Sequence, residues 1–328
     1  MESKKRKILL TGASGQLGRR LLPALMSSGF LVRAHYRTPE RARKYCPAGV
    51  DTVCGDLIEP SWLDDAAAGC DIVIHGAAKV SLRPGQNDRQ FKINVEGTRR
   101  VIEACARNEV RRLIYISSVV TVGASEDGSL LDENATFNLA GYNIPYAETK
   151  HQAEILTLSA NGPKLQVIVV NPSIMISAPD RPVTPKELRK IPRFMPAYFD
   201  FAINVVETED VIKGILAAVD RGRPGQRYLL TGENLTPQRV FELAKKYLGI
   251  KKPRLKIPLF FLTPIATIVE VVSKIKGERP KFHRGLARMA RLKFFYSCDK
   301  ARRELGFNPK PLEQTIENIL SGIPGLKK

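Results

Sequence analysis

The feature that most constrains the fold is a glycine-rich turn that follows a short apolar run near the start of the chain. Residues 7–18 read KILLTGASGQLG, so the run Ile8–Leu10 ends in a turn that leads into a helix-like segment. Glycine lets the backbone approach a phosphate closely, and the free N–H groups at a helix N-terminus stabilise an anion. Many strand–turn–helix units carry two glycines for steric reasons, so the surrounding sequence decides whether this turn is a dinucleotide site.

Apolar runs and helix-like segments alternate up to about residue 170. This alternation is typical of a parallel sheet that is covered by helices on both faces. We therefore predict an α/β fold with a doubly wound parallel sheet. The predicted strands after the first are 30–36, 50–54, 71–75, 113–116 and 167–170, and the predicted helices are 17–28, 91–108 and 146–157.

The alternation stops after Ser173. Residues 178–201 hold five prolines and five basic residues, which predicts a loop-rich basic lid. We divide the chain into a nucleotide-binding domain over 1–172, to which 202–231 returns, and a substrate-binding region formed by 173–201 and 232–328. The return is predicted as a strand at 204–206, a helix at 208–219 and a strand at 228–230, followed by a helix at 237–248 that Thr236 caps.

The end of the second predicted strand bears on the choice of cofactor. A site that prefers NAD places an acidic residue about 20 residues beyond the glycines, where it bonds the adenosine ribose. Positions 33–37 contain no acid, but Arg37 at the strand end, helped by Arg33, suits the 2′-phosphate of NADP. We expect NADP(H) to be preferred and NAD(H) to be possible. The alternative is that both arginines are solvated.

Two more turns point toward a nucleotide. Asp56 is placed to accept a hydrogen bond from an adenine amino group while Leu57 packs on the ring, or else Asp56 caps the helix that begins near Pro60. The strand 71–75 ends in Gly76, Ala77 and Ala78. Small residues at the C-terminal end of a parallel strand keep space free for a ligand.

Ser118, Tyr146 and Lys150 form a candidate catalytic set. Tyr146 and Lys150 lie four residues apart on one helix face, and Ser118 follows a predicted strand. Hydride transfer to a ketone requires a proton at the developing alkoxide, but a tyrosine with a pKa of about 10 is a poor base near neutrality. We expect Lys150 to lower the pKa of Tyr146, and Ser118 to hold the substrate oxygen. Taken alone, Tyr146 and Lys150 would be a surface pair.

Several stretches, in their order and spacing, resemble the extended short-chain dehydrogenase/reductase family of the NAD-dependent epimerase/dehydratase type. Within that family the chain is similar to the dihydroflavonol 4-reductase-like group and, more closely, to the hopanoid-associated sugar epimerase group, through 195–211, 227–236 and 288–307. The resemblance covers nearly the whole chain. The other stretches are TGASGQLG (11–18), GDL (55–57), HGAA (75–78), NVEGT (94–98), SSVVTVG (117–123), YAETK (146–150) and NPS (171–173).

The resemblance implies a Rossmann domain with a smaller C-terminal substrate-binding region. Gly12, Gly15 and Gly18 would clamp NAD(P), and Lys150 would also reach the cofactor. The other residues that we expect at the cofactor are Ser14, Gln16, Leu17, Arg37, Asp56, Leu57, Gly76, Ala77, Ala78, Pro172 and Ser173.

The resemblance also assigns catalytic roles. Tyr146 would be the acid/base, with Lys150 as its partner and Ser118 as the catalytic serine, for which Ser117 is the substitute. Asn94 matches a family asparagine that supports the active site. Members of the family often dimerise through a four-helix bundle, which here would use helices near 91–108 and 146–160, so we expect a homodimer.

Charge and cysteine content narrow the remaining classes. The formal net charge of +19 is compatible with nucleic acid, an anionic membrane, an acidic substrate or a solubilised surface. No nucleic-acid-binding signature accompanies it, so we expect no nucleic acid partner. The five cysteines are never spaced as CxxC, and no secretion signal is evident, so we expect no metal site and a cytoplasmic location.

The segment 257–272 is apolar, and 274–293 holds eight basic residues against one acid. Because Pro258 and Pro264 interrupt the apolar segment and it is short for a bilayer, it favours a core or lid helix. Shallow peripheral contact with an anionic membrane is the alternative. The basic lid suggests an anionic substrate and the apolar segment a lipid-like one.

Three functions are open at this point. The first is an NADP(H)-dependent carbonyl reductase or alcohol dehydrogenase that acts on a small-molecule carbonyl or alcohol. The second is an epimerase or dehydratase acting on an activated sugar, although the chain lacks the Tyr-Phe-Asn run expected after Pro172 in sugar 4-epimerases. The third is a non-catalytic NADP(H)-binding regulator, a class that usually lacks the tyrosine or the lysine.

Overall fold

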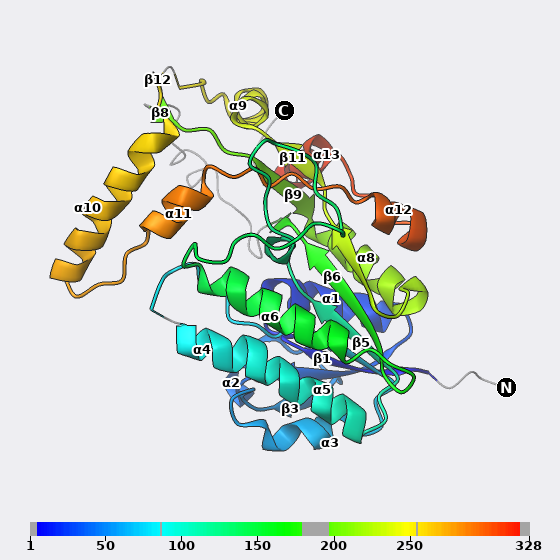
Figure 1. Ribbon diagram of the computed structural model, residues 1–328. Helices are drawn as coiled ribbons and strands as arrows, with labels where there is room; N and C mark the ends of the chain where they lie inside the picture. Colours follow the sequence, from blue (N-terminus) through cyan, green and yellow to red (C-terminus); the bar gives the residue numbers. More distant parts are fainter. Residues whose placement is uncertain (1–4, 86, 179–196, 254, 322–328) are drawn as a thin grey trace.

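A seven-stranded sheet, with strand order β10-β6-β5-β4-β1-β2-β3, forms the centre of the computed structural model. The structure describes residues 5–85, 87–178, 197–253 and 255–321 (Figure 1). Every pair of neighbouring strands in this sheet is parallel, which confirms the predicted doubly wound α/β architecture. The strands are β1 (Lys7–Thr11), β2 (Leu31–Tyr36), β3 (Asp51–Cys54), β4 (Ile72–His75), β5 (Arg112–Ile116), β6 (Gln166–Pro172) and β10 (Gln226–Leu230).

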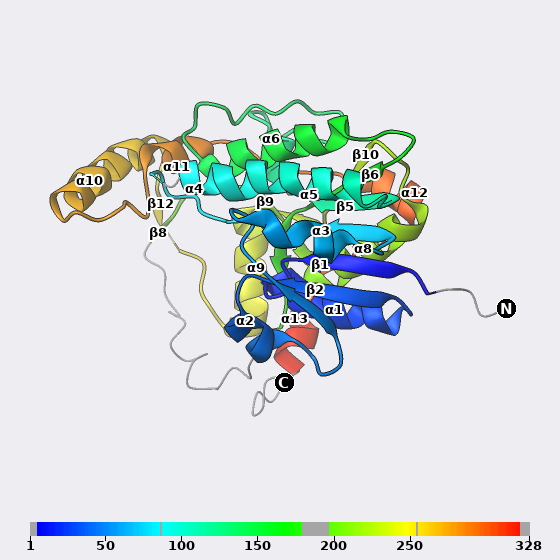
Figure 2. The ribbon, with the colours of Figure 1, turned by 90° about the horizontal axis from the view of Figure 1, so that it is seen from below.

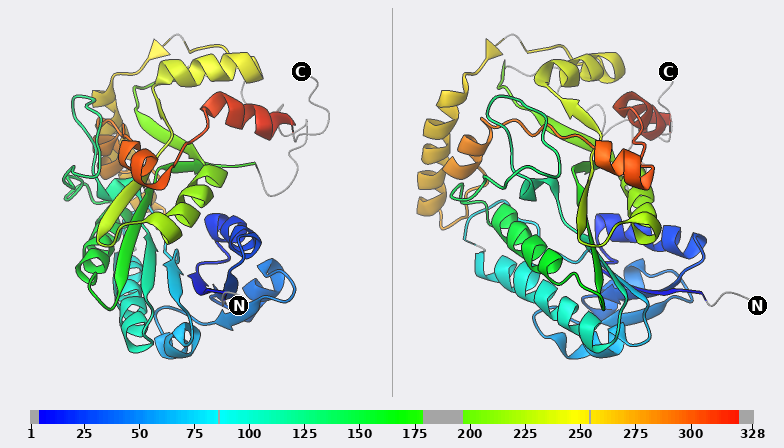
Figure 3. Two further views of the ribbon diagram at one scale, coloured as in Figure 1. Left: turned by 90° about the vertical axis from the view of Figure 1, so that its right-hand side faces the viewer. Right: turned by 45° about the vertical axis from the view of Figure 1, so that its right-hand side comes forward.

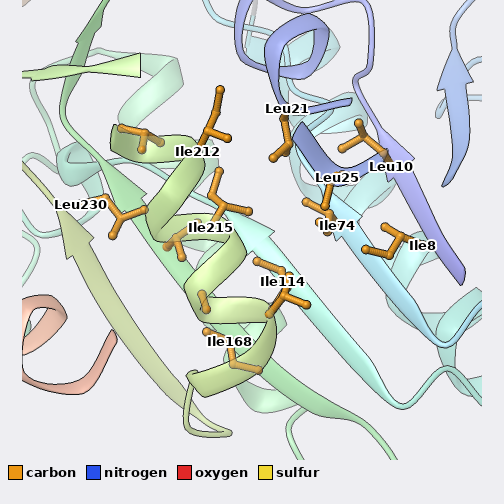
Figure 4. Packing of buried hydrophobic residues seen from close by; sticks show 14 of the residues in the cluster. Ile8, Leu10, Leu21, Leu25, Ile74, Ile114, Ile168, Ile212, Ile215 and Leu230 are labelled. Atoms are coloured by element: carbon orange, nitrogen blue, oxygen red, sulfur yellow. The ribbon is translucent and has the colours of Figure 1, made fainter. Parts of the chain in front are cut away.

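Helices cover both faces of the sheet, as the buried strands require. Successive side chains of a strand point to opposite faces, so Ile8 and Leu10 of β1 enter one core cluster and Leu9 enters the other. Figure 3 shows the sheet between the two helical layers, and Figure 4 shows the packing on the side of α1 and α8. That side carries α1 (Gln16–Ser27), α8 (Thr208–Arg221) and α12 (Asp299–Leu305), and the other carries α3 (Leu63–Ala67), α5 (Gly97–Arg107) and α6 (Pro145–Ser159).

The predicted helix at 91–108 contains an irregularity. It is a continuous segment made of α4 (Asn87–Phe91), the π-helical turn η2 (Lys92–Glu96) and α5. Single π-turns inside α-helices often occur at functional sites. Here the turn contains Asn94, which is 1% exposed, so a residue with poor helix propensity is placed inward.

The segment after β6 returns only in part to the main sheet. Helix α8 packs on β5 and β6, and β10 pairs with β6. The strand predicted at 204–206 is β9 (Ile203–Glu207), which lies instead in a separate sheet of order β11-β9-β7. Its partners are β7 (Ile174–Ile176) and β11 (Glu233–Leu235). The division of the chain into two domains stays a prediction.

The C-terminal elements gather beyond one end of the main sheet (Figure 1). Thr236 caps α9 (Pro237–Leu248) as predicted, because its side chain accepts a hydrogen bond from the Arg239 N–H. The predicted basic lid falls largely on 179–196, outside the described residues.

The remaining elements of the whole chain are α2 (Pro39–Tyr45), β8 (Ala197–Tyr198), β12 (Leu255–Lys256), α10 (Leu262–Ile275), α11 (Arg284–Met289) and α13 (Leu312–Ser321), with the short turns η1 (Pro60–Trp62), η3 (Val119–Thr121) and η4 (Leu259–Phe261).

The apolar segment forms η4 and α10, at the periphery of the molecule. Only Leu262 and Ala266 of α10 are buried, so the core alternative of the prediction is wrong, and a lid helix stays a prediction. The segment stays outside the core because the two faces of the sheet are already covered by other helices. Among the described residues, no helix has the length and apolar character needed to cross a membrane.

Candidate active site

The glycine turn between β1 and α1 brings the backbone close to the end of β4. Gly12 has φ +80°, and a Cβ at this position would lie 2.8 Å from the Ala77 nitrogen. Glycine adopts such a φ without steric penalty and fits where no side chain can. Gly15 is the N-cap of α1 and makes no side-chain hydrogen bond to the first N–H groups of the helix. These groups have no partner within the helix and can bond a ligand. This cradle suits a pyrophosphate.

A cavity of about 350 Å3 opens at this turn, at the carboxyl ends of β1, β2, β3 and β4. Nine of the predicted cofactor residues line it: Gly12, Ser14, Gly15, Arg37, Asp56, Leu57, Gly76, Ala77 and Ala78. Its further lining residues are His35, Arg41, Gly55, Lys79, Val80, Arg89 and Ile93. A ligand at the carboxyl ends of parallel strands is typical of doubly wound sheets.

The two arginines that were predicted to bind the 2′-phosphate, Arg33 and Arg37, have different surroundings. Arg33 bonds the Asp51 carboxylate at 2.8 Å and donates to the carbonyls of Asp65, Ala66 and Ala68, so the help predicted from Arg33 is wrong. Arg33 lies in the middle of β2, and its side chain extends to the C-terminal end of α3, where these carbonyls hold it. Arg37 is exposed at the cavity.

Arg41 is a cavity residue that the sequence analysis missed. It lies in the first turn of α2 and reaches back to the cavity, where its guanidinium lies 3.4 Å from the Ser14 hydroxyl. Arg41 follows Arg37 by four residues, a spacing that could have indicated a second arginine at the cavity. Using it required knowing that a helix begins at Pro39. Arg37 and Arg41 therefore line the cavity together, and Arg89 is a third arginine in its wall.

The far end of the cavity is built from rigid aromatic contacts. The rings of His35 and Trp62 stack with centroids 4.1 Å apart, and burial lowers the pKa of His35 to about 4, so this histidine is neutral. The Asp56 carboxylate accepts a hydrogen bond from the Ile58 N–H at 3.1 Å, which holds the turn. Asp56 thus stabilises its own loop, not the helix proposed near Pro60, and still lines the cavity.

Ser118 and Tyr146 are brought together from segments far apart in the chain. Ser118 follows β5 and begins η3, while Tyr146 lies in the first turn of α6. Burial raises the pKa of Tyr146, and a hydrogen bond with the Ser118 side chain offsets part of that rise. The net direction is opposite to the lowering predicted from Lys150. Tyr146 is therefore a neutral phenol near pH 7.

Lys150 is buried beside the end of β5. Its Nζ donates to the Tyr115 hydroxyl and to the Ile116 carbonyl, both at 2.7 Å. Burial lowers the pKa of Lys150 to about 7, with Glu154 one turn further along α6 favouring the charged form. Because the ammonium is held by these two acceptors and is itself desolvated, it does not lower the pKa of Tyr146 in this arrangement.

Asn94 connects the cavity wall to the helix that carries the tyrosine. Its side chain accepts from the Lys79 N–H at 2.7 Å and donates to the Lys79 carbonyl at 3.1 Å. It also donates to the hydroxyl of Thr149, which lies next to Lys150 on α6. Lys79 lines the cavity. Asn94 is therefore a positioning residue between the two parts of the site.

A second buried network fixes α6 from its other side. Glu154 is 2% exposed and accepts from Thr121 and Asn171 at 2.7 Å, and its other oxygen pairs with Arg227 of β10 at 3.1 Å. These contacts tie α6 to the ends of β5, β6 and β10. A buried carboxylate requires such partners.

The other predicted site residues lie outside the cavity. Gln16, Leu17 and Gly18 belong to α1, where a Cβ on Gly18 would clash with the Gly12 carbonyl. Pro172 ends β6, and the buried hydroxyls of Ser117 and Ser173 have no hydrogen-bond partner among the described residues. These two unpaired hydroxyls follow the neighbouring strands β5 and β6, and a polar ligand at the carboxyl ends of these strands could bond them.

The family model that matches residues 8–230 is that of the NAD-dependent epimerase/dehydratase family. The chain therefore belongs to this family, an enzyme family that binds NAD, and the predicted resemblance is confirmed.

Two relatives and one solved structure resemble the chain over almost its whole length. A Synechocystis protein provisionally named a dihydroflavonol 4-reductase is 30% identical over 318 residues, which cover 95% of this chain and 92% of that protein. Sterol demethylase protein B of Methylococcus capsulatus is 30% identical over 312 residues, 92% and 93% of the two chains. The crystal structure of gox2253 superposes with a TM-score of 0.79 at 30% identity, covering 97% and 98%.

Proposed function

We propose that the protein is an NADP(H)-dependent carbonyl reductase or alcohol dehydrogenase. The observation that carries this proposal is the pairing of Tyr146 with Ser118, one helical turn from a buried Lys150. Asn94 links this helix to the nucleotide cavity through its hydrogen bonds to Thr149 and Lys79. The resemblance of the chain to a named reductase supports it. Bound NADPH supplies the hydride, and the protein supplies orientation and the proton.

The protonation state of Tyr146 suits reduction. Since burial raises its pKa, the phenol holds its proton near neutral pH and can deliver it to the alkoxide oxygen that forms as the carbonyl is reduced. The Ser118 hydroxyl, which bonds Tyr146, is placed to hold that same oxygen. The hydrogen bond with Ser118, which lowers the pKa of Tyr146 against the effect of burial, stabilises the tyrosinate that is left.

Two arginines support the preference for NADP(H). Arg37 and Arg41 both line the cavity, and neither has an acidic partner among the described residues. Guanidinium groups form forked hydrogen bonds to phosphate, so the pair would bind the 2′-phosphate. NAD(H) lacks that phosphate and would bind more weakly.

The substrate and the assembly belong to the same proposal. One relative is named for a sterol, which supports a substrate with a lipid-like body. Exposed apolar side chains on α4 and α6, Phe91 at 41% and Ile155 at 55%, support a homodimer through these helices.

An epimerase or dehydratase acting on an activated sugar is the second candidate, because the family includes both activities. Such an enzyme oxidises and re-reduces within one cycle and keeps its cofactor bound. The absorbance spectrum of the purified protein distinguishes the two. A reductase comes free of cofactor and consumes NADPH when a panel of aliphatic, aromatic and steroid ketones is added. Bound cofactor near one per chain, with no net consumption, would favour the epimerase or dehydratase.

A further inference from the structure

Helix α10 and the last residue of η4 expose a continuous apolar stripe. Its members are Phe261, Ile265, Ile268, Val272 and Ile275, which follow one another at intervals of four, three, four and three residues and so lie on one helix face. Their exposed fractions run from 42% for Ile265 to 80% for Ile275. We refer to these five residues as the α10 stripe. A contiguous exposed apolar surface of this kind marks an interaction site.

The opposite face of α10 is already used within the protein. Leu262 and Ala266 are buried and pack with Ala287 of α11. In Figures 1 and 2 the helix lies at the edge of the molecule, with α11 between it and the body of the protein. The α10 stripe therefore faces away from the protein core.

Basic residues lie on both sides of the stripe in the sequence. Lys274 and Lys276 stand at its C-terminal end, and Lys251 and Lys252 come before it on the chain. All four are exposed, and the Lys252 ammonium lies 5.8 Å from the centre of the Tyr198 ring. Such an arrangement suits a helix that lies in the interfacial plane of an anionic membrane, with lysines at the level of the headgroups.

We propose that the α10 stripe and its flanking lysines bind peripherally to the surface of an anionic lipid bilayer. The apolar side chains enter the boundary between headgroups and acyl chains, and the lysines contact the acidic headgroups. The net charge of +19 attracts the protein to such a surface over longer distances.

Charge disfavours a second copy of the chain as the occupant. An antiparallel pair of α10 helices would bring Lys274 and Lys276 of each copy toward the lysines that precede α10 in the other. Like charges oppose that contact, because Glu270, the acid within α10, is already paired with Arg284. An anionic bilayer offers the opposite sign along the whole length of the stripe.

Contacts through α11 connect α10 to the helix that carries Tyr146. Helix α10 packs on α11, and the segment that follows α11 places Leu292 in one apolar cluster with Ala147, the residue after Tyr146. Gly285 of α11 lies against the Tyr142 carbonyl so closely that no Cβ fits. Membrane contact at α10 would thus be made by an element that packs on α11, which in turn lies against the segment before the catalytic tyrosine.

Flotation with lipid vesicles tests the proposal without any substrate, so its outcome is independent of the proposed enzyme activity. The full chain is mixed with vesicles of phosphatidylcholine with phosphatidylglycerol, or of phosphatidylcholine alone. We expect flotation with the anionic vesicles, weaker flotation with the neutral ones, and a decrease as salt rises from about 0.1 to about 0.5 M.

Two double variants address the two parts of the surface. Ile268→Glu with Ile275→Glu, and separately Lys274→Glu with Lys276→Glu, should each reduce partitioning by more than about tenfold. Leu130→Glu is the matched control, because Leu130 is 58% exposed on a different surface and should leave partitioning unchanged. Circular dichroism of each variant verifies that it is folded.

Three results would overturn the proposal. The first is no flotation of the wild-type chain with anionic vesicles, and the second is equal flotation of the isoleucine variant. The third is a concentration-dependent dimer in light scattering that the isoleucine variant alone abolishes, which would assign the stripe to a second copy of the chain.

Discussion

Burial sets the protonation states of the two central side chains. The phenol of Tyr146 has a raised pKa, and the pKa of the Lys150 ammonium falls to about 7, both chiefly through desolvation. Lys150 is 2% exposed, so little water screens the effect. The site is thus arranged to hold a proton on tyrosine and to adjust the charge on lysine near neutral pH.

The lowered pKa of Lys150 has a consequence for stability. Between pH 7 and the unfolded pKa near 10.5 the unfolded chain binds a proton that the folded chain has released, so this lysine makes the protein more stable as pH rises. We expect the difference in unfolding free energy, wild type minus Lys150→Met, to grow by up to about 1.4 kcal/mol per pH unit from pH 7 to 8.5. Urea unfolding at several pH values measures it. A constant difference would show that Lys150 stays charged.

Arg37 should determine the choice of cofactor. Arg37→Ala removes charge-assisted hydrogen bonds worth about 1.5–3 kcal/mol, so the Kd for NADPH should rise about 10- to 100-fold while that for NADH changes little. Trp62, the single tryptophan, stacks on His35 of the cavity and reports binding by fluorescence.

Arg43→Ala is the control for this titration, because Arg43 lies on the same helix as Arg41 but outside the cavity. Equal weakening of NADPH and NADH by Arg37→Ala would remove the basis for an NADP(H) preference.

At the scale of elements, the glycine turn joins β1, α1 and the end of β4. Gly12 and Gly29 both have φ above +75°, so alanine at either position is strained by about 1–2 kcal/mol. A Cβ on Gly29 meets open space, whereas one on Gly12 meets Gly76 and Ala77. Gly12→Ala should therefore destabilise the protein by about 1–3 kcal/mol more than Gly29→Ala, and should weaken cofactor binding. Thermal unfolding compares the two, and equal losses would contradict the tight packing of the turn.

The elements of the nucleotide-binding part could be predicted because local patterns determine them. Each strand is an apolar run that ends at a turn, and the glycines mark the turn that packs against Gly76 and Ala77 after β4. Arg41, Tyr115 and Glu154 were missed for a different reason. Their roles come from contacts between segments far apart, such as the bond of Lys150 to Tyr115, and no local spacing indicates them.

At the scale of the whole molecule, the position of β9 and the exposure of α10 were the features that sequence could not determine. The apolar run in β9 would fit a buried position in either sheet. It lies in the three-stranded sheet because of how all the strands pair, which the local sequence does not determine. The apolar content of α10 suggests burial, yet its outer face has no described partner.

Assembly is a further prediction at this scale. If two chains pair through α5 and α6, Ile155→Glu places a charge in an apolar interface and should shift the protein toward monomer. Light scattering at several concentrations measures the mass. Leu31→Glu is the control, since Leu31 is 52% exposed on β2, away from these helices. A wild-type monomer at all concentrations would contradict the expected homodimer.

The central claim is that Tyr146 transfers the proton that accompanies hydride transfer. The most direct measurement is the rate of NADPH consumption with a ketone that the wild-type protein reduces, compared with that of Tyr146→Phe. We predict a loss of at least about 100-fold in kcat, with the Kd for NADPH by Trp62 fluorescence unchanged. A Tyr146→Phe protein that binds NADPH normally and reduces the ketone at the wild-type rate would contradict it.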